Sequence, residues 1–263
     1  MFSPVAACNI ADHEAWFATF TAEYRATEQG ETGPIDLKIE HTAMVLAHAR
    51  RIVDEVQPAP TVARCALLGA LYHDVGRFPQ YAQYHTFSDP RSVNHGYLGA
   101  RTLHAHRPLA HEPRHIQRLV TGSVVLHNRY VLPAGISEDL RLVTDVVRDA
   151  DKLDIFRIMA AHLDPEGPHD KVVVLHLQDQ PDRFTQKIVD DARAGRPARY
   201  ADLRYINDFR LLLGSWVSEL RFDVTRHVLC QSRLMHNVLG GLPDIAILQR
   251  TADQLLAQLE RQD

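Results

Sequence analysis

Apolar side chains recur at helical spacing along most of the chain, and this pattern predicts a succession of α-helices. In residues 12–29, Trp16, Phe20 and Tyr24 recur every four positions, and Gly30 is a natural stop. Further helices are expected at 36–56, at 61–73, from His95 to about 106, at about 114–128, from Ser137 past Asp151 to Ile158, and at 182–194, 202–220, 222–238 and 244–261. The expected fold class is therefore all-α.

Polar residues and helix breakers indicate where these helices begin and where they are interrupted. The candidate N-caps are Asp36, Thr61, Asn94 or Ser92, and Ser137. Residues 76–93 are rich in aromatic and polar side chains and contain two prolines, so we expect a structured loop there. The short β-branched run Lys171–Leu177 fits either an extended segment or a buried helix.

Four of the expected helices carry a metal-capable residue on a mostly apolar stripe. These residues are His41, His73, His127 and Asp151. Positions three or four apart on a helix share one face, so packing of these faces would bring the four side chains together. Asp74 follows His73 directly, and His95 would join from the start of a helix. One or two polar residues on core stripes are expected as hydrogen-bonded core residues, but four such stripes favour a shared site.

Composition narrows the function classes that need to be considered. The 263 residues are 45% hydrophobic and 24% charged, which is typical of a globular chain that can bury a sizeable core. A net charge of −4 gives no electrostatic case for binding nucleic acid. The three cysteines are far apart and form neither a disulfide framework nor a thiolate zinc site. Without a leader or a long apolar run, we expect a cytoplasmic protein with no membrane partner. The 16 histidines are the one unusual feature.

Four histidines and two aspartates exceed what one tetrahedral ion needs and suit a two-metal centre. Neighbouring side chains on a helix point about 100° apart, so His73 could hold one ion while Asp74 bridges two. A pair of ions can generate a hydroxide nucleophile and bind a phosphoryl oxygen. The same ligands around iron could activate oxygen instead, so the ligand set leaves the reaction open.

The ordered series His41, His73-Asp74, His95, His127 and Asp151 resembles the HD-domain superfamily of metal-dependent phosphohydrolases in its binuclear form. The surrounding segments are similar to a bacterial subfamily of HD proteins; they are Leu71–Pro79, Thr86–Asp89, Ser92–Gly96 and Asp149–Asp154. The resemblance implies an all-α bundle. Because the chain shows no internal repeat and no low-complexity linker, we expect a single domain over 1–263. Its metal-binding core would span about 36–157, and helices within 182–261 would pack on that core.

The resemblance also implies how the ligands divide between two ions. One ion would be held by His41, His73, Asp74 and Asp151, and a second would be held with His95 and His127. The expected cofactors are two divalent first-row ions, drawn from Fe, Mn, Co, Ni and Zn.

Position 77 departs from the best-known branches of the superfamily. Nucleotidase-type members carry a glutamate there, whereas this chain has Arg77. A cation at this position is similar to cyclic-di-nucleotide phosphodiesterases and to mixed-valent di-iron oxygenases of the same fold. Gly96-Tyr97 is followed by Leu98, however, so the Gly-Tyr-Pro signature of the cyclic-di-nucleotide enzymes is absent. We therefore expect a small, diffusible substrate.

The expected activity is hydrolysis of a small phosphate ester, with a nucleotide the first choice, by attack of a metal-bound hydroxide. The catalytic candidates are Asp74, Arg77 and Lys152, and the substrate-binding candidates are Arg77, Gln80, Asn128 and Lys152. Two alternatives stay open: an HD-fold mixed-valent di-iron oxygenase, and a nucleotide-binding regulator without turnover. A complete ligand set weighs against the regulator.

Overall fold

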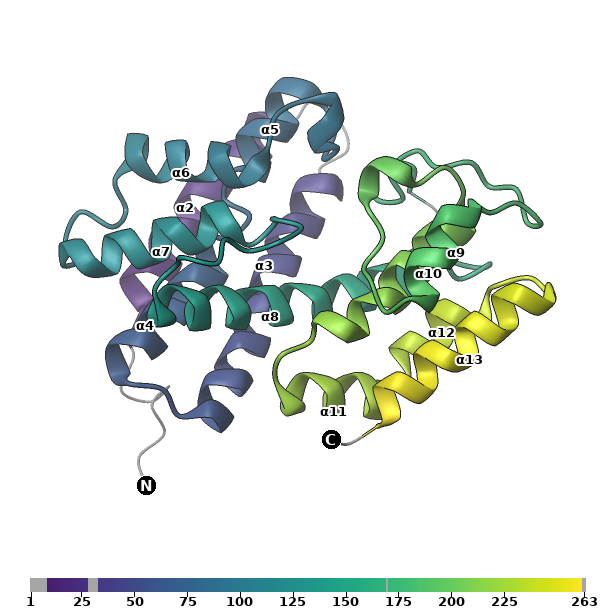
Figure 1. The fold of residues 1–263 in the computed structure, drawn as a ribbon. Helices are drawn as coiled ribbons and strands as arrows, with labels where there is room; N and C mark the ends of the chain where they lie inside the picture. The colour runs from purple at the N-terminus through teal and green to yellow at the C-terminus, as the bar shows by residue number, and fades with distance from the viewer. Residues whose placement is uncertain (1–8, 28–32, 169, 262–263) are drawn as a thin grey trace. The chain divides into compact units, whose positions relative to one another are not determined.

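The structure is a computed structural model that describes residues 9–27, 33–168 and 170–261. Within these ranges the chain is helical, with a single isolated bridge between Gln178 and Tyr205 and no strand, so the all-α fold class is confirmed (Figure 1). None of the described helices combines the length and apolar character needed to cross a membrane. The expected stop at Gly30 lies outside the described residues.

The chain divides into two compact units, Met1–Asp151 and Lys152–Asp263. The division falls inside one long helix, α8 (Glu138–His162), which contributes its first part to one unit and its second part to the other. The expectation of a single domain over 1–263 stays a prediction.

The first unit is a helical bundle built around α4. Besides the first part of α8, its helices are α2 (Ala11–Thr27), α3 (Gly33–Val56), α4 (Pro60–Tyr72), α5 (Arg77–Tyr84), η1 (Asp89–Arg91), α6 (His95–His106) and α7 (Arg114–Leu126). The central helix α4 packs against α3 and α7, and α6 packs against α7. Most of α4 is buried for that reason. A Cβ atom at Gly69 would lie 2.7 Å from Ser123 Oγ and 3.0 Å from Val147, so this position needs glycine.

The second unit is organised around α10. Besides the rest of α8, it contains α9 (Gln186–Arg193), η2 (Tyr200–Asp202), α10 (Ile206–Ser215), η3 (Trp216–Glu219), α11 (Asp223–Ser232), α12 (Leu234–Gly240) and α13 (Ala246–Glu260). Helix α10 packs against α9, α12 and α13, and Leu211, Leu212 and Leu213 are fully buried in consequence. The Asp208 carboxylate accepts hydrogen bonds from the backbone N–H groups of Thr185, Arg204 and Tyr205. These hydrogen bonds stabilise the N-terminal end of α10.

Two expected caps are confirmed and two are wrong. The Asn94 side chain accepts a hydrogen bond from the Tyr97 backbone, and Ser137 Oγ accepts one from the Leu140 backbone. Asp36, by contrast, lies inside the first turn of α3, which already begins at Gly33.

Thr61 is not a cap either, because α4 begins one residue earlier, at Pro60, with Ala59 in the N-cap position. Proline favours the first helical position, since its fixed φ suits the helix and its missing N–H is not needed there.

The loop expected over 76–93 is partly wrong, because it contains the helix α5 and the short 3₁₀ helix η1. In α5 the side chains of Phe78, Gln80 and Tyr81 are buried. Their burial stabilises a helix that the weak apolar pattern of the segment did not predict. The helix expected at 222–238 is divided at Arg233, whose φ of 54° ends α11. Residues 171–176 of the run Lys171–Leu177 form consecutive turns, which is neither of the two structures expected from its composition.

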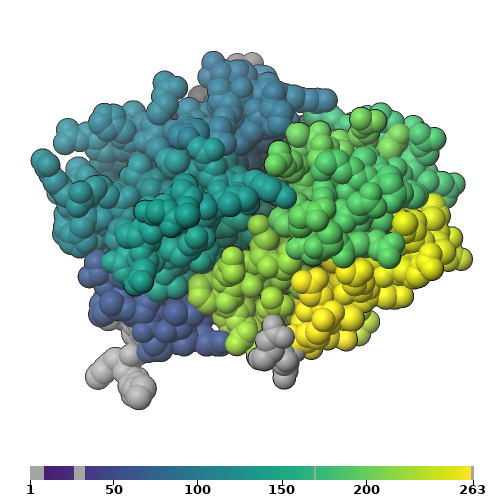
Figure 2. All heavy atoms as spheres, viewed as in Figure 1, coloured from purple at the N-terminus to yellow at the C-terminus, as the bar shows by residue number. Residues whose placement is uncertain are grey.

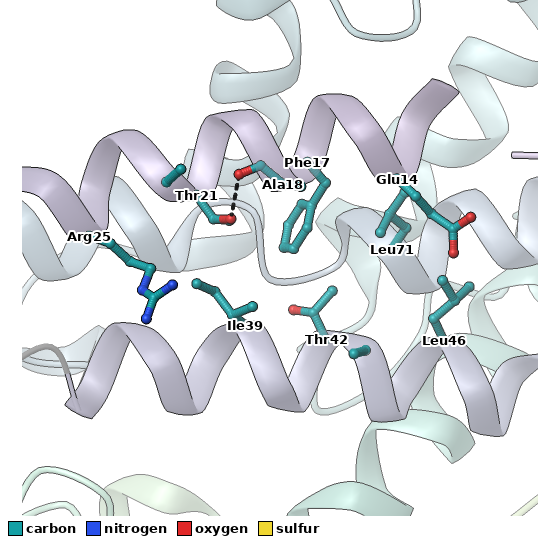
Figure 3. A pocket seen from close by; sticks show the side chains of 11 residues that line it. Glu14, Phe17, Ala18, Thr21, Arg25, Ile39, Thr42, Leu46 and Leu71 are labelled. Atoms are coloured by element: carbon teal, nitrogen blue, oxygen red, sulfur yellow. Dashed lines mark hydrogen bonds between the residues drawn. The ribbon is translucent and has the colours of Figure 1, made fainter. Parts of the chain in front are cut away.

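An apolar groove lies between α2 and α3 on the surface of the first unit (Figure 3). It has a volume of about 330 Å³, and its lining includes Phe17, Ile39 and Leu71. None of the predicted site residues lines it. In the space-filling view, side chains coloured as α6 and α7 cover much of the first unit's visible face (Figure 2).

Candidate metal centre

The six predicted metal ligands all lie in the first unit, and the structure brings them together. His41 is in the middle of α3, His73 and Asp74 directly follow α4, and His95 is the first residue of α6. His127 follows the last residue of α7, and Asp151 comes from α8. Five of the six ligands are buried and Asp151 is half-buried.

Three of these side chains form a first cluster, consisting of His41, His73 and Asp151. His41 Nε2 lies 3.1 Å from Asp151 Oδ1 and 3.3 Å from His73 Nε2, and His73 Nε2 lies 3.7 Å from Asp151 Oδ1. One carboxylate oxygen and two imidazole nitrogens at such separations can contact a common ion.

Asp74, His95 and His127 form a second cluster. His95 Nε2 and His127 Nε2 are 3.0 Å apart, and they lie 3.5 Å and 3.8 Å from Asp74 Oδ1. The other oxygen of the same carboxylate, Oδ2, lies 3.6 Å from His41 Nε2 and 3.7 Å from His73 Nε2. Asp74 therefore offers one oxygen to each cluster, which is the arrangement of a bridging carboxylate.

The positions of the imidazole protons show that these side chains suit a cation. Nδ1 of His73 and Nδ1 of His127 each lie 2.8 Å from a backbone carbonyl, of Ala70 and Val124 respectively. Nδ1 of His95 lies 2.8 Å from an Asp89 carboxylate oxygen. Carbonyl and carboxylate oxygens only accept, so in each neutral ring Nδ1 carries the proton and Nε2 presents a lone pair. Two lone pairs 3.0 Å apart, on His95 and His127, repel each other unless a cation lies against both.

The pKa values of five of the six side chains keep them in the forms that bind metal; these five are His73, Asp74, His95, His127 and Asp151. Burial lowers the pKa of His73 and of His95, and together with the neighbouring histidines it lowers the pKa of His127 to about 3. Burial would raise the pKa of Asp74, but Lys38 and His73 hold it well below the usual value. Burial has the same effect at Asp151, where the hydrogen bond with His41 and the charge of His73 prevail and lower its pKa. Neutral imidazoles and ionised carboxylates need lose no proton to bind a metal ion.

Two cationic side chains lie against the bridging carboxylate. Lys38 Nζ is 2.7 Å from Asp74 Oδ2, and Arg77 Nε is 3.4 Å from Asp74 Oδ1. Arg77 was a predicted site residue, whereas Lys38 was missed. The sequence did contain a signal for it, because Lys38 precedes His41 by three residues on the same helix and so shares its face.

A network behind the second cluster holds His95 in place, and its centre is Asp89, which sequence analysis also missed. Asp89 accepts from His95 Nδ1, from Arg77 Nη1 at 3.1 Å and from Gln80 Nε2 at 3.0 Å. Burial would raise the pKa of Asp89, but the hydrogen bond from His95 and the positive charge of Arg77 lower it to about 2. No periodic signal could have identified Asp89, because it begins the three-residue helix η1, which is too short to show a helical pattern.

Gln80 and Asn128 belong to this network. Gln80 is fully buried, and its amide accepts from Arg77 Nη1 and donates to Asp89, Ser92 and the Val93 carbonyl. Asn128 Nδ2 donates to Asp89 Oδ2 at 3.3 Å, while its buried Oδ1 has no hydrogen-bond partner among the described residues. Their roles as substrate contacts stay predictions.

Lys152, the remaining candidate, belongs to the second unit. Its ammonium lies 3.3 Å from Glu219 and 5.8 Å from the centre of the Trp216 ring. Its roles in catalysis and phosphate binding stay predictions.

A family comparison bears on the whole ligand set. The HD domain family matches residues 39–192, which is more than half of the chain and includes all six ligands. Comparison with curated proteins finds no match, and comparison with solved structures finds none either. The extent of the family match is decisive: the chain belongs to the HD domain family of metal-dependent phosphohydrolases.

Proposed function

We propose that this protein hydrolyses a small phosphate ester, with a nucleotide as the first choice of substrate. The observation that carries the proposal is the position of Lys38 and Arg77 against Asp74, the carboxylate shared by both ligand clusters. Positive side chains beside a metal centre suit a substrate whose reacting group is an anion.

The two clusters would each hold one divalent first-row ion, drawn from Fe, Mn, Co, Ni and Zn, with Asp74 between them. When bound, such ions supply positive charge to a phosphoryl oxygen and lower the pKa of a water molecule.

The chain's own residues would orient and neutralise the substrate. Arg77 would donate to a phosphate oxygen, while Asp89 and Gln80 hold its Nη1 and fix the direction of its guanidinium. Asp89 also fixes the tautomer of His95, so that Nε2 is the ligand atom. We further propose Gln80 and Asn128 as residues that act through this network, and Lys152 as a phosphate contact.

A di-iron oxygenase of the same fold is the second candidate. It is favoured by the same nitrogen and oxygen donors and by the cationic side chain of Arg77, which resembles the residue found in that class. A regulator that binds nucleotides without turnover is the third. The net charge of −4 favours a small-molecule partner over nucleic acid, and we expect the protein to be cytoplasmic.

Anaerobic assays of phosphate release distinguish the phosphohydrolase from the oxygenase. The metal-free protein is reconstituted separately with Mn, Fe, Co, Ni and Zn and tested against nucleotides and other small phosphate esters. We expect inorganic phosphate to be released without oxygen, and we expect Asp74→Asn, which keeps the size of the side chain, to abolish release. Turnover that requires oxygen, with no phosphate released from any ester, would instead establish the oxygenase.

A further inference from the structure

Lys38 and Arg77 share more than a contact with Asp74, because both also lie over the ring of Phe87. Lys38 Nζ is 5.4 Å and Arg77 Cζ is 5.8 Å from the centre of this ring. Phe87 is buried, and its backbone carbonyl accepts a hydrogen bond from Arg77 Nη1. The ring attracts both cations and restricts both side chains, although the residues come from different helices.

Each of the two cations keeps donors that no described residue uses. The Lys38 ammonium has three N–H groups, and Asp74 is its one hydrogen-bond acceptor in the described chain. Arg77 directs Nη1 to Gln80, Phe87 and Asp89, whereas Nη2 donates to none of the described residues. Each side chain is 15% exposed, so neither is completely buried.

The charge of the site favours a ligand with more than one negative charge. Asp74, Asp151 and Asp89 contribute three carboxylates, and histidine binds metal through its neutral imidazole. Two divalent ions together with Lys38 and Arg77 would carry more positive charge than the three carboxylates carry negative charge. A phosphate monoester carries close to two negative charges near neutral pH, whereas a diester carries one.

We infer that Lys38 and Arg77 together bind the terminal phosphate of a phosphomonoester, and that Lys38 is the substrate-binding residue that makes the site prefer monoesters over diesters. This inference rests on the proposed phosphohydrolase function and names its substrate class. Lys38 reaches the phosphate from the Oδ2 side of Asp74, and Arg77 reaches it from the Oδ1 side.

A purely structural role for Lys38 makes a different prediction. If its ammonium only neutralised Asp74, its removal would alter metal affinity and leave phosphate binding unchanged. Phosphate affinity and metal content therefore have to be measured separately on the same protein.

The experiment titrates inorganic phosphate into manganese-loaded protein by calorimetry. Lys38→Met should weaken phosphate binding about tenfold to a hundredfold, the usual range for loss of a charge-assisted contact. Lys38→Arg should stay within about threefold of wild type, because the charge and its donors remain. Manganese content should be the same in all proteins. Lys171→Met removes an exposed lysine elsewhere in the chain and is the matched control.

A second measurement tests the preference for monoesters. The ratio of kcat/KM for p-nitrophenyl phosphate to that for bis(p-nitrophenyl) phosphate should fall about tenfold in Lys38→Met, since a monoester loses more from the missing charge. If Lys38→Met does not fold, Lys38→Gln replaces it, because glutamine keeps a donor for Asp74 without the charge.

The outcomes separate this inference from the proposed function. Unchanged phosphate affinity in folded Lys38→Met, or a change in manganese affinity alone, would overturn the inference even if phosphate esters are hydrolysed. Phosphate binding that depends on Lys38 would support it even if no ester were turned over, and in that case the proposed function would fail instead.

Discussion

Two groups of histidine and acidic side chains in the described part of the first unit differ in where their protons lie: the metal centre and a hydrogen-bond network around His13. In one, His13 Nδ1 pairs with the Tyr72 hydroxyl at 2.9 Å and His13 Nε2 pairs with Glu112 Oε1 at 3.0 Å. Arg64 donates to both oxygens of Glu112. Each ring nitrogen of His13 thus has a protein partner, and the charge of Glu112 is neutralised within the cluster.

In the metal centre, only the Nδ1 atoms of His73, His95 and His127 are satisfied in that way. Apart from Asn128 Nδ2, which lies 3.5 Å from His95 Nε2, their Nε2 atoms face other histidine nitrogens and the oxygens of Asp74, none of which donates. Tyr72 and His73 are adjacent in sequence, yet one completes a closed hydrogen-bond network and the other an open ligand set. Burial therefore does not identify a histidine ligand; the partner of its second nitrogen does.

The largest effect should come from removing a ligand of the metal centre. His73→Ala and Asp74→Ala are each expected to eliminate bound metal and activity, because each takes away a central donor. His13→Ala is the matched control from the closed network and should keep its metal. The measurement is elemental analysis together with an activity assay, on proteins whose folding is checked by circular dichroism. Full metal content in folded His73→Ala would contradict the distinction between the metal centre and the closed His13 network.

His127→Ala should have an intermediate effect, because it weakens only the second cluster. We expect about half of the metal to remain, with activity strongly reduced. Metal stoichiometry at saturating metal is the measurement. If folded His127→Ala keeps all its metal and full activity, the centre holds one ion and the second cluster is not a metal site.

Arg77→Ala should lower activity without removing metal, because Arg77 is proposed to contact the substrate. A charge-assisted contact to phosphate is worth about 1.5–3 kcal/mol, which corresponds to a decrease in kcat/KM of roughly tenfold to a hundredfold. Arg77→Lys should recover part of the loss, since the charge remains. Full activity in Arg77→Ala would show that the assignment of this residue to phosphate is mistaken.

The smallest effect is expected in the closed network, and it concerns stability alone. Glu112→Gln should lower the free energy of unfolding by about 1–3 kcal/mol near neutral pH, since the hydrogen bonds from Arg64 and His13 lose their charged acceptor. Metal content should not change. A loss of metal in Glu112→Gln would mean that the His13 network and the metal centre are coupled, and it would weaken the distinction between them.

The same variant has a pH dependence with a definite sign. The hydrogen bond from Arg64 lowers the pKa of Glu112 below its usual value of 4.5, and it prevails over the opposing effect of burial. A lowered pKa stabilises the folded state above the unfolded pKa, and this contribution is lost as the pH falls through the folded value. The difference in unfolding free energy between wild type and Glu112→Gln should therefore be largest above pH 4.5 and shrink below it. Denaturant titrations at several pH values test this expectation.

Much of the ligand set could be predicted from sequence because its signal is local. His41, His73 and Asp151 repeat the helical spacing of apolar neighbours, so each could be assigned to a core-facing stripe without knowing its partners. Lys38 could have been found by the same reasoning, one helical turn before His41. Asp89 could not, because its link to His95 depends on how an irregular segment folds back.

The α5 segment shows the same limit at the level of secondary structure. Residues 77–84 contain Pro79 and many polar side chains, and they are helical because tertiary burial of Phe78, Gln80 and Tyr81 outweighs weak local propensity. That helix in turn places Arg77 and Gln80 behind the second cluster.

The amino-acid sequence by itself determined the all-α class and most of the helices, because helical periodicity and short-range spacing are encoded in neighbouring residues. The same spacing, together with the family resemblance, predicted the six candidate ligands. Only the tertiary structure decided which histidines share a cluster, that Asp74 divides its two oxygens between clusters, and that Lys38 and Arg77 meet over Phe87. These features depend on distances between residues far apart in the chain. Such distances follow from how helices pack, which is set jointly by all the side chains in the interface and by no local pattern.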